Sequence, residues 1–238
     1  NLGGRISADQ LNLNAQNDLN NIGGTIDANT SAVIRAGNNV NMSTTTNTAA
    51  NNYGSETVVN RVAGLYVGNG ANALLADSEQ PVNTLLIQAG NNVNLNAAQI
   101  SNAGTGGSRI EAITGDVNLG TVQQGKQERI YRDARNGHVV NETSAVGTQI
   151  AGVGNVSLVA GRDVNTQAAD VSSEDGTLAV KAGRDINIAT GNSSRETVAD
   201  SYEHKKGFLS SKSTTIHNES QSQNSIASNL TGSSVVLD

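Results

Sequence analysis

A seven-residue phrase that recurs along the chain constrains its fold more than any other feature. The phrase reads Ala-Gly, then two polar residues, then Val or Ile, then Asn, then a last residue that is apolar in most copies. Full copies begin at Ala36, Ala89, Ala160 and Ala182, and weaker copies begin at Thr114 and Gly154. Repeats of this kind are typical of architectures in which stacked units contact mainly their neighbours. We therefore expect an elongated, repetitive structure.

The residue types in the phrase predict a turn followed by a short strand. Glycine adopts positive φ without a Cβ penalty, and a neighbouring Asn or Asp bonds its own backbone. The apolar–polar–apolar alternation that follows is the period of a β-strand. A second alternating run precedes several copies, as in Leu85–Ala89 and Leu178–Ala182. No stretch has sustained helical periodicity with caps, so we expect strands and turns without helices.

The spacing of the repeats indicates the fold class. The phrase Asn1–Ile6 returns as Asn21–Ile26 after 20 residues, and Ala160 is followed by Ala182 after 22 residues. Leucine-rich repeats have a similar length, but their Leu spacing and helical half are missing here. We therefore predict an all-β right-handed parallel β-helix, a solenoid whose coils of about 20–22 residues stack at roughly 4.8 Å.

Stacked coils place equivalent side chains in columns along the axis. We expect an inward column that contains Val40, Val93, Val164 and Ile186, and turn columns of Asn or Asp that bond along the stack. Residues 1–238 are expected to form a single β-helix segment of a longer filament, because the chain begins and ends in mid-pattern. The expected coils are 1–20, 21–42, 82–100, 101–122, 148–170 and 171–190, with a last coil that begins near Gly232.

Three longer stretches interrupt the short period: residues 43–81, 123–147 and 191–230. Each leaves the coil just after the apolar–Asn–apolar strand, and Asn136-Gly137 in the second stretch is a strong hairpin signal. We interpret each stretch as a β-hairpin or small flap that projects from the stack. Insertions on one face of a repeat protein often bind partners, whereas a hairpin can also merely cover an exposed sheet edge. The sequence leaves both interpretations open.

The composition excludes several other classes. Aromatic residues make up 2% of the chain, and Trp and Cys are absent, so neither a core of large rings nor a disulfide framework is expected. The regular apolar alternation excludes disorder. The net charge is −6, and no basic stripe carries interleaved aromatic residues, so we expect no nucleic-acid partner. No apolar run is long enough to cross a membrane as a helix.

One short stretch has the composition of a surface contact. Lys205, Lys206 and Lys212 flank Phe208 and Leu209 within the third interruption. A basic hairpin tip with exposed apolar residues can touch a membrane surface or another anionic partner. The same residues also suit an ordinary solvated tip. The stretch is therefore a candidate contact site with two interpretations.

No pattern in the chain indicates catalysis or a bound cofactor. Asp163 and Asp185 occupy equivalent positions on neighbouring coils, which is the arrangement a pair of catalytic carboxylates would need. Asn39 and Asn92 fill the same position elsewhere, however, and Asn cannot act as a general acid or base. The three histidines are far apart in the sequence, which does not suit a metal site. We expect a protein that is not an enzyme and holds no metal or cofactor.

Together the phrases resemble the haemagglutinin repeats of exoproteins exported by two-partner secretion. The resemblance depends on the Ala-Gly phrase, on Gly-Gly-Thr-Ile at residues 23–26 and on the Lys-rich stretch at residues 205–213. Filamentous haemagglutinins and the filament proteins of contact-dependent growth inhibition carry similar repeats. The resemblance implies a right-handed β-helix that a partner outer-membrane transporter exports to the surface of a Gram-negative cell.

The resemblance implies two roles that the sequence does not separate. In growth-inhibition filaments, similar repeats lie between the receptor-binding part and a C-terminal toxin, and they help to deliver that toxin into target bacteria. In host-directed adhesins, similar repeats form a stalk or contact host cells. The partner is then a target-cell or host-cell surface, and the Lys-rich stretch would add contact with a membrane. A toxin domain after this segment, with an immunity gene beside it, would favour the first role.

Overall fold

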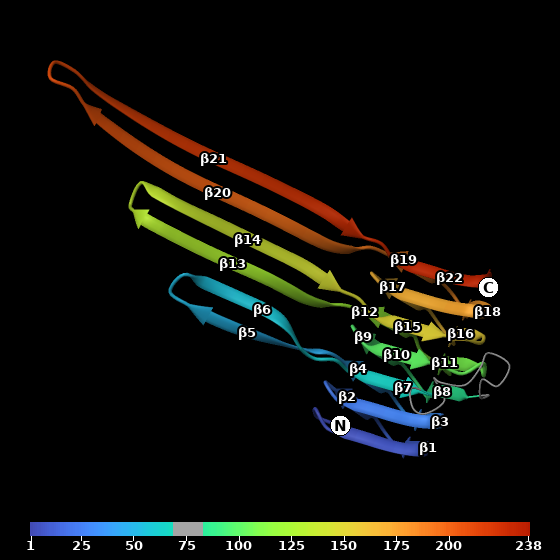
Figure 1. The fold of residues 1–238 in the computed structure, drawn as a ribbon. Helices are drawn as coiled ribbons and strands as arrows, with labels where there is room; N and C mark the ends of the chain where they lie inside the picture. The colour runs from blue at the N-terminus through green and yellow to red at the C-terminus, as the bar shows by residue number, and fades with distance from the viewer. Residues whose placement is uncertain (69–82) are drawn as a thin grey trace.

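The computed structural model describes residues 1–68 and 83–238, and within these residues it contains β-strands and connecting turns but no helix. Figure 1 shows an elongated stack of short strands, with the two termini at opposite ends and three long hairpins that project from one side. The expected all-β class is confirmed.

The strands of the stack recur in groups that we call coils. Each complete coil contains three strand segments, and in some coils the first two segments merge into one long strand. In chain order the coils are β1 (Arg5–Ala15) with β2 (Leu19–Ile22); β3 (Thr25–Ala36) with β4 (Val40–Ser43); β7 (Gly64–Val67), β8 (Thr84–Ala89) and β9 (Val93–Asn96); β10 (Gln99–Asn102), β11 (Ser108–Ala112) and β12 (Val117–Gly120); β15 (Gln149–Gly152), β16 (Val156–Ala160) and β17 (Val164–Gln167); β18 (Asp170–Ala182) with β19 (Ile186–Ala189); and β22 (Asn229–Leu237).

Neighbouring coils pair in parallel and in register. Val40 of β4 pairs with Val93 of β9, and Val93 pairs with Val117 of β12. Val164 of β17 and Ile186 of β19 extend the same column. The four valines are fully buried. The predicted column is therefore confirmed, and it also includes Val117, from one of the weaker copies of the phrase.

Two further columns fill the interior, and both are almost completely shielded from solvent. Repeating the same side chain at every coil repeats the same packing, so Val, Ile, Leu and Ala suffice to fill the core without large rings. In the first segments the column is Ile26, Leu65, Ile100, Ile150 and Val171, and in the second segments it is Ile34, Ile87, Ile110, Leu158 and Val180.

The first interruption is shorter than the predicted stretch 43–81. Residues Gly64–Val67 form β7, which pairs in parallel with β3 and β10 and so belongs to the stack. That part of the prediction is wrong. The repeated phrase is missing there, but Leu65 and Val67 keep the inward apolar alternation of a strand and are fully buried. Residues 69–82, which include the last part of the predicted stretch, lie outside the described residues.

The coils close in two ways that alternate along the stack. The first, third and fifth coils end in a short turn with positive φ at Gly23, Ala97 and Ala168, where φ is 58°, 48° and 47°. Gly adopts positive φ without a Cβ penalty, whereas Ala97 and Ala168 are uncommon examples of residues with a Cβ in this conformation. The second, fourth and sixth coils instead continue into hairpins. A hairpin therefore leaves every second coil.

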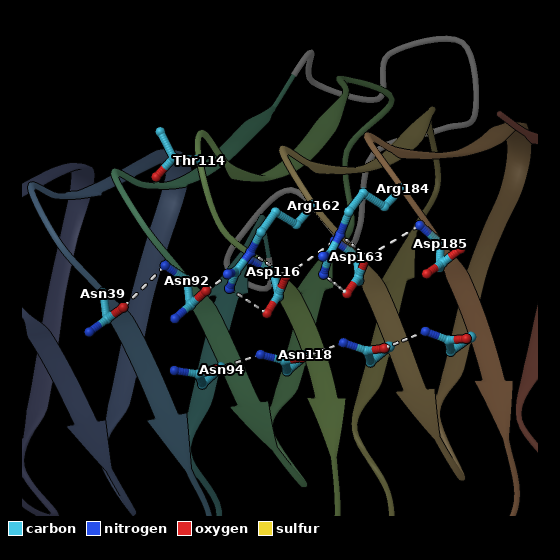
Figure 2. A network of polar contacts seen from close by, with 12 residues as sticks. Asn39, Asn92, Asn94, Thr114, Asp116, Asn118, Arg162, Asp163, Arg184 and Asp185 are labelled. Carbon is cyan, nitrogen blue, oxygen red and sulfur yellow. Dashed lines mark hydrogen bonds and ion pairs between the residues drawn. The ribbon is translucent and has the colours of Figure 1, made fainter.

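Two columns of polar side chains bond the coils together outside the core (Figure 2). In the third segments, each Asn donates from Nδ2 to Oδ1 of the Asn one coil earlier, over distances of 2.8–2.9 Å. At the preceding turn, each Asn or Asp accepts on Oδ1 from the backbone N–H one coil later, at 2.8–3.3 Å. The expected turn column is confirmed. The strand ladder contains Asn20, Asn41, Asn94, Asn118, Asn165 and Asn187, and the turn column contains Asp18, Asn39, Asn92, Asp116, Asp163 and Asp185.

Candidate functional site

Three hairpins project from the same side of the stack and form its most prominent surface (Figure 1). Each begins after the third strand segment of a coil. The third hairpin ends earlier than the predicted stretch 191–230, because Asn229 already pairs with Asp170 inside the stack, ahead of the predicted start near Gly232. Hairpin 1 is β5 (Thr45–Asn51) with β6 (Gly54–Arg61), hairpin 2 is β13 (Val122–Asp133) with β14 (Asn136–Val146), and hairpin 3 is β20 (Gly191–Lys206) with β21 (Ser211–Ile226).

The hairpins pair with one another as well as within themselves. They form one six-stranded antiparallel sheet in the order β21-β20-β14-β13-β6-β5. Between hairpins 1 and 2, Gly54–Thr57 pairs with Gly125–Glu128. Between hairpins 2 and 3, Gly137–Ser144 pairs with Ser193–Asp200. The sequence indicated separate hairpins, and it did not indicate this lateral sheet.

Polar side chains add to the backbone pairing between hairpins 2 and 3. Asn141 of hairpin 2 donates to Glu196 of hairpin 3 at 2.9 Å, and within hairpin 2 it accepts from Gln127 at 3.1 Å. Arg195 and Glu142 form an ion pair at 2.6 Å. The Arg195 side chain is 61% exposed, and an ion pair as exposed as this contributes little. The backbone ladder therefore supplies most of the attachment.

Hydroxyl groups anchor the bases of the hairpins to the stack. Thr44, just before hairpin 1, donates to the carbonyl of Ala97 at 2.5 Å. Thr148, just after hairpin 2, donates to the carbonyl of Leu95 at 2.7 Å. Ser228, just after hairpin 3, donates to the carbonyl of Ala189 at 2.7 Å. Sequence reasoning missed these residues, and their only signal is a Thr or Ser beside each hairpin.

One face of the hairpin sheet carries two open hollows of about 490 and 470 Å³. Both are lined by Glu56 and Lys126, so they adjoin across hairpins 1 and 2. Along one row of directly paired residues the charges alternate, from Glu56 through Lys126 and Glu142 to Arg195. This face can offer hydrogen-bond donors and acceptors to a polar surface, and it favours neither sign of charge.

The five residues predicted as a contact site lie together at the far end of hairpin 3, the longest of the three. Phe208 is 101% exposed and Leu209 is 93% exposed, which leaves their side chains open to solvent. Lys205 and Lys212 face each other as a directly paired couple, and Lys206 follows Lys205 at the end of β20. The structure thus brings the predicted residues together.

Of the two carboxylates considered as catalytic candidates, that of Asp163 holds neighbouring coils together. Asp163 receives two hydrogen bonds from the Arg184 guanidinium, at 3.0 and 2.5 Å, and one from the backbone of Asp185 (Figure 2). The hydrogen bonds from Arg184 hold the pKa of Asp163 below its ordinary value. A general acid needs the opposite shift, towards neutral pH. The geometry therefore assigns Asp163 a structural role.

The histidines do not come together. His138, His204 and His217 lie on the hairpins, where His204 contacts Ser213 at 2.9 Å and His217 contacts Asp200 at 2.6 Å. Across residues 1–68 and 83–238, no three His, Cys, Asp or Glu side chains gather as they would around a metal ion. The same residues include no helix that is long and apolar enough to span a bilayer.

Comparison with known proteins identifies one family. The model of the Hemagglutinin repeat family matches residues 72–207, more than half of the chain. No curated protein and no solved structure matches the chain. The matched stretch begins within the third coil and covers the fourth to sixth coils, hairpin 2 and all of β20, so the family repeat includes both the stack and the projecting sheet. This chain belongs to the haemagglutinin repeat family, whose repeats are structural and adhesin-type rather than enzymatic.

Proposed function

We propose that this chain is a segment of a right-handed parallel β-helix in a secreted filament on the surface of a Gram-negative bacterium. The observation that carries the proposal is the in-register stacking of coils that bear the haemagglutinin repeat. Coils that contact only their neighbours form rods whose length grows with the number of repeats. Such a rod holds other parts of a filament away from the cell that makes it.

A solenoid explains the strand pairing better than a closed barrel. Pairing runs in a ring through β3, β7, β10, β15, β18, β16, β11 and β8. The ring closes because β3 pairs with β7 through its first part and with β8 through its second part. β18 divides in the same way between β15 and β16. The ring thus joins two stacked sheets, and a third sheet from β2 to β19 completes each coil.

We favour a structural role in toxin delivery, as in growth-inhibition filaments. In those filaments similar repeats help to bring a C-terminal toxin into target bacteria. The feature that supports this role is the hairpin sheet, which runs beside the stack and ends in a basic, apolar tip. A rod with a sheet that projects sideways can contact a second cell while the rod itself stays intact.

A host-directed adhesin stalk is the second candidate. The two open hollows on the hairpin sheet favour it, because they offer alternating charges and hydroxyl groups to a polar surface. In both roles a partner outer-membrane transporter exports the chain. The absence of Cys suits that route, since no disulfide can form before the coils have crossed the membrane.

A variant of the parent filament with a shortened hairpin 3 distinguishes the two roles. In this variant hairpin 3 keeps only residues 191–193 and 224–226, which are joined by Asn-Gly. A second variant shortens hairpin 1 in the same way and thereby removes one wall of both hollows. Surface display is measured by antibody labelling, inhibition of target bacteria by co-culture, and adhesion by binding to host cells. We expect display and adhesion to persist while target inhibition is lost with hairpin 3. Lost adhesion with unchanged inhibition in the hairpin 1 variant would establish the adhesin instead. Intact filaments without a meridional reflection near 4.8 Å would contradict the β-helix.

A further inference from the structure

We propose that the tip of hairpin 3 docks onto an anionic phospholipid surface. The tip comprises residues 203–213, which include the ends of β20 and β21 and the turn between them. The inference goes beyond the filament role, which would stand without it. It depends on the exposure of two apolar side chains, on the arrangement of three lysines and on the reach of the hairpin.

The turn of hairpin 3 places its two apolar residues where turns ordinarily place polar ones. The backbone N–H of Gly207 donates to the carbonyl of Ser210 at 2.7 Å, which leaves Phe208 and Leu209 as the two loop residues. Turn positions of this kind favour Gly, Asn, Asp and Ser. Phe208 and Leu209 are 101% and 93% exposed, so they contribute nothing to packing within the chain. Only a surface outside the chain can bury them.

The lysines surround these two side chains on both faces of the hairpin. Lys205 pairs directly with Lys212, and like charges placed directly opposite destabilise a sheet. Glu203 forms an ion pair with Lys205 at 3.0 Å, and it therefore neutralises only one of the three lysine charges. Lys206 pairs with Ser211 and so projects from the other face. An anionic surface would relieve this repulsion while the turn residues enter the bilayer interface.

The tip reaches past every other part of the hairpin sheet. β14 pairs with β20 as far as Asp200, and Asn136 still accepts a hydrogen bond from the backbone of Tyr202, so β20 continues for four residues, 203–206, beyond its last contact with hairpin 2. At about 3.4 Å per residue this is an overhang of roughly 14 Å. Figure 1 shows hairpin 3 as the longest projection, with its turn farthest from the stack. A flat surface can therefore meet the tip before it meets hairpins 1 and 2.

The charge distribution favours an end-on approach. With histidine neutral, residues 203–213 carry a charge of +2, from three lysines and Glu203. The whole chain carries −6, so the remainder carries −8. An anionic surface attracts the tip and repels the rest, and both effects weaken as salt increases.

The other two tips differ from this one, although hairpin 2 also carries exposed Ile130 and Tyr131, which lie within β13 and not in the turn. At the tip of hairpin 2, Asp133 accepts hydrogen bonds from Arg135 and Asn136, and Arg135 lies over the Tyr202 ring at 4.5 Å. Hairpin 1 carries a single exposed ring, Tyr53, and no lysine. Only hairpin 3 joins adjacent apolar turn residues to several lysines.

The test measures co-sedimentation of the 238-residue chain with vesicles of phosphatidylcholine, with and without phosphatidylglycerol. We expect binding only to the anionic vesicles, and we expect it to fall as salt rises. F208S/L209S and K205S/K206S/K212S should each lower the partition coefficient at least about tenfold. The controls are Y53S/I130S, which removes exposed apolar side chains elsewhere, and R129S/R132S/K181S, which removes three cations elsewhere. Both controls should bind like the parent chain.

A single tryptophan then reports where contact occurs. The chain contains no Trp, so F208W and Y53W each create a unique fluorophore. On addition of anionic vesicles, the emission of F208W should shift to shorter wavelength and be quenched by brominated lipid, while that of Y53W should stay unchanged. Circular dichroism confirms that each variant keeps its strands.

Three results would overturn the proposal. The first is equal binding to neutral and anionic vesicles. The second is unchanged binding of F208S/L209S. The third is a combination of two observations: the tip binds soluble dextran sulfate through its lysines, and F208W shows no wavelength shift on vesicles. This combination would assign the tip to an anionic polysaccharide instead. None of these results bears on export or on the stacking of the coils.

Discussion

At the scale of single residues, the ladder of asparagines makes its inner and outer members unequal. Asn118 donates to Asn94 and accepts from Asn165, both within 2.9 Å, whereas Asn187 makes one ladder bond, to Asn165. We expect Asn118→Ala to lower the free energy of unfolding by about 1–3 kcal/mol, because it removes two bonds and leaves Oδ1 of Asn94 and Nδ2 of Asn165 without their partner. Asn187→Ala should cost about half as much. Urea unfolding followed by circular dichroism measures both, and equal losses would mean that the ladder does not stabilise the stack.

A titrating histidine gives the second prediction at this scale. A hydrogen bond to Asp200 at 2.6 Å raises the pKa of His217 above its ordinary value of 6.5, and Glu219 adds a smaller effect of the same sign. The pair therefore stabilises the folded chain most below pH 6.5, where His217 is protonated in the unfolded chain as well. This stabilisation is lost as the pH rises through the raised pKa of the folded chain. An NMR titration should place the midpoint of His217 above 6.5 and should lower it in Asp200→Asn. A midpoint unaffected by Asp200→Asn would show that the contact does not persist in solution.

At the scale of elements, Gly54 marks the closest approach between hairpins 1 and 2. A Cβ at Gly54 would lie well inside contact distance of the Gln127 carbonyl, which is backbone and cannot turn away. We expect Gly54→Val to separate β6 from β13 while the stack remains folded. Hydrogen exchange should accelerate in Gly125–Glu128 and stay slow in β12. Gly107→Ala is the control, since a Cβ there meets its nearest atom at 3.8 Å, and protection of Gly125–Glu128 equal to that of the parent chain would contradict the prediction.

The same elements show how far the sequence alone could lead. Repeated phrases such as Ala89–Leu95 predicted the coils, because one phrase in one register must build one column. β7 was missed because it carries the inward Leu65 and Val67 without the phrase. The pairing of hairpins was missed because strands such as β21 are polar on both faces and carry no alternation that specifies a neighbour. The Lys-rich tip could be identified from composition, while its exposure and its overhang depend on the length of the neighbouring hairpins.

At the scale of the whole molecule, the spacing of coils and the spacing of hairpin strands match. Strands lie about 4.8 Å apart both in the stack and in the hairpin sheet. A hairpin supplies two strands and leaves every second coil, so two coils advance the stack by the same distance that one hairpin advances the sheet. A hairpin on every coil would crowd the sheet, and one on every third coil would break it. The alternation of short turns and hairpins is therefore what allows both sheets to be continuous.

This match predicts opposite results for two deletions. Removing residues 149–169 joins Thr148 to Asp170, takes out one coil and leaves the core columns in register, since Gln149 pairs with Asp170. Hairpins 2 and 3 would then start one coil apart and could not both stay in the sheet. Removing residues 64–148 instead takes out two coils together with hairpin 2, and β20 can replace β13 beside β6.

Hydrogen exchange in β20 distinguishes the two deletions. Protection of Ser193–Asp200 should be lost after the smaller deletion, of one coil, and kept after the larger one, although the larger one removes about four times as many residues. The core strands should remain protected in both. Retained protection of β20 after the one-coil deletion would mean that the hairpin sheet adjusts freely to the stack. In that case the alternation of turns and hairpins would have no structural consequence.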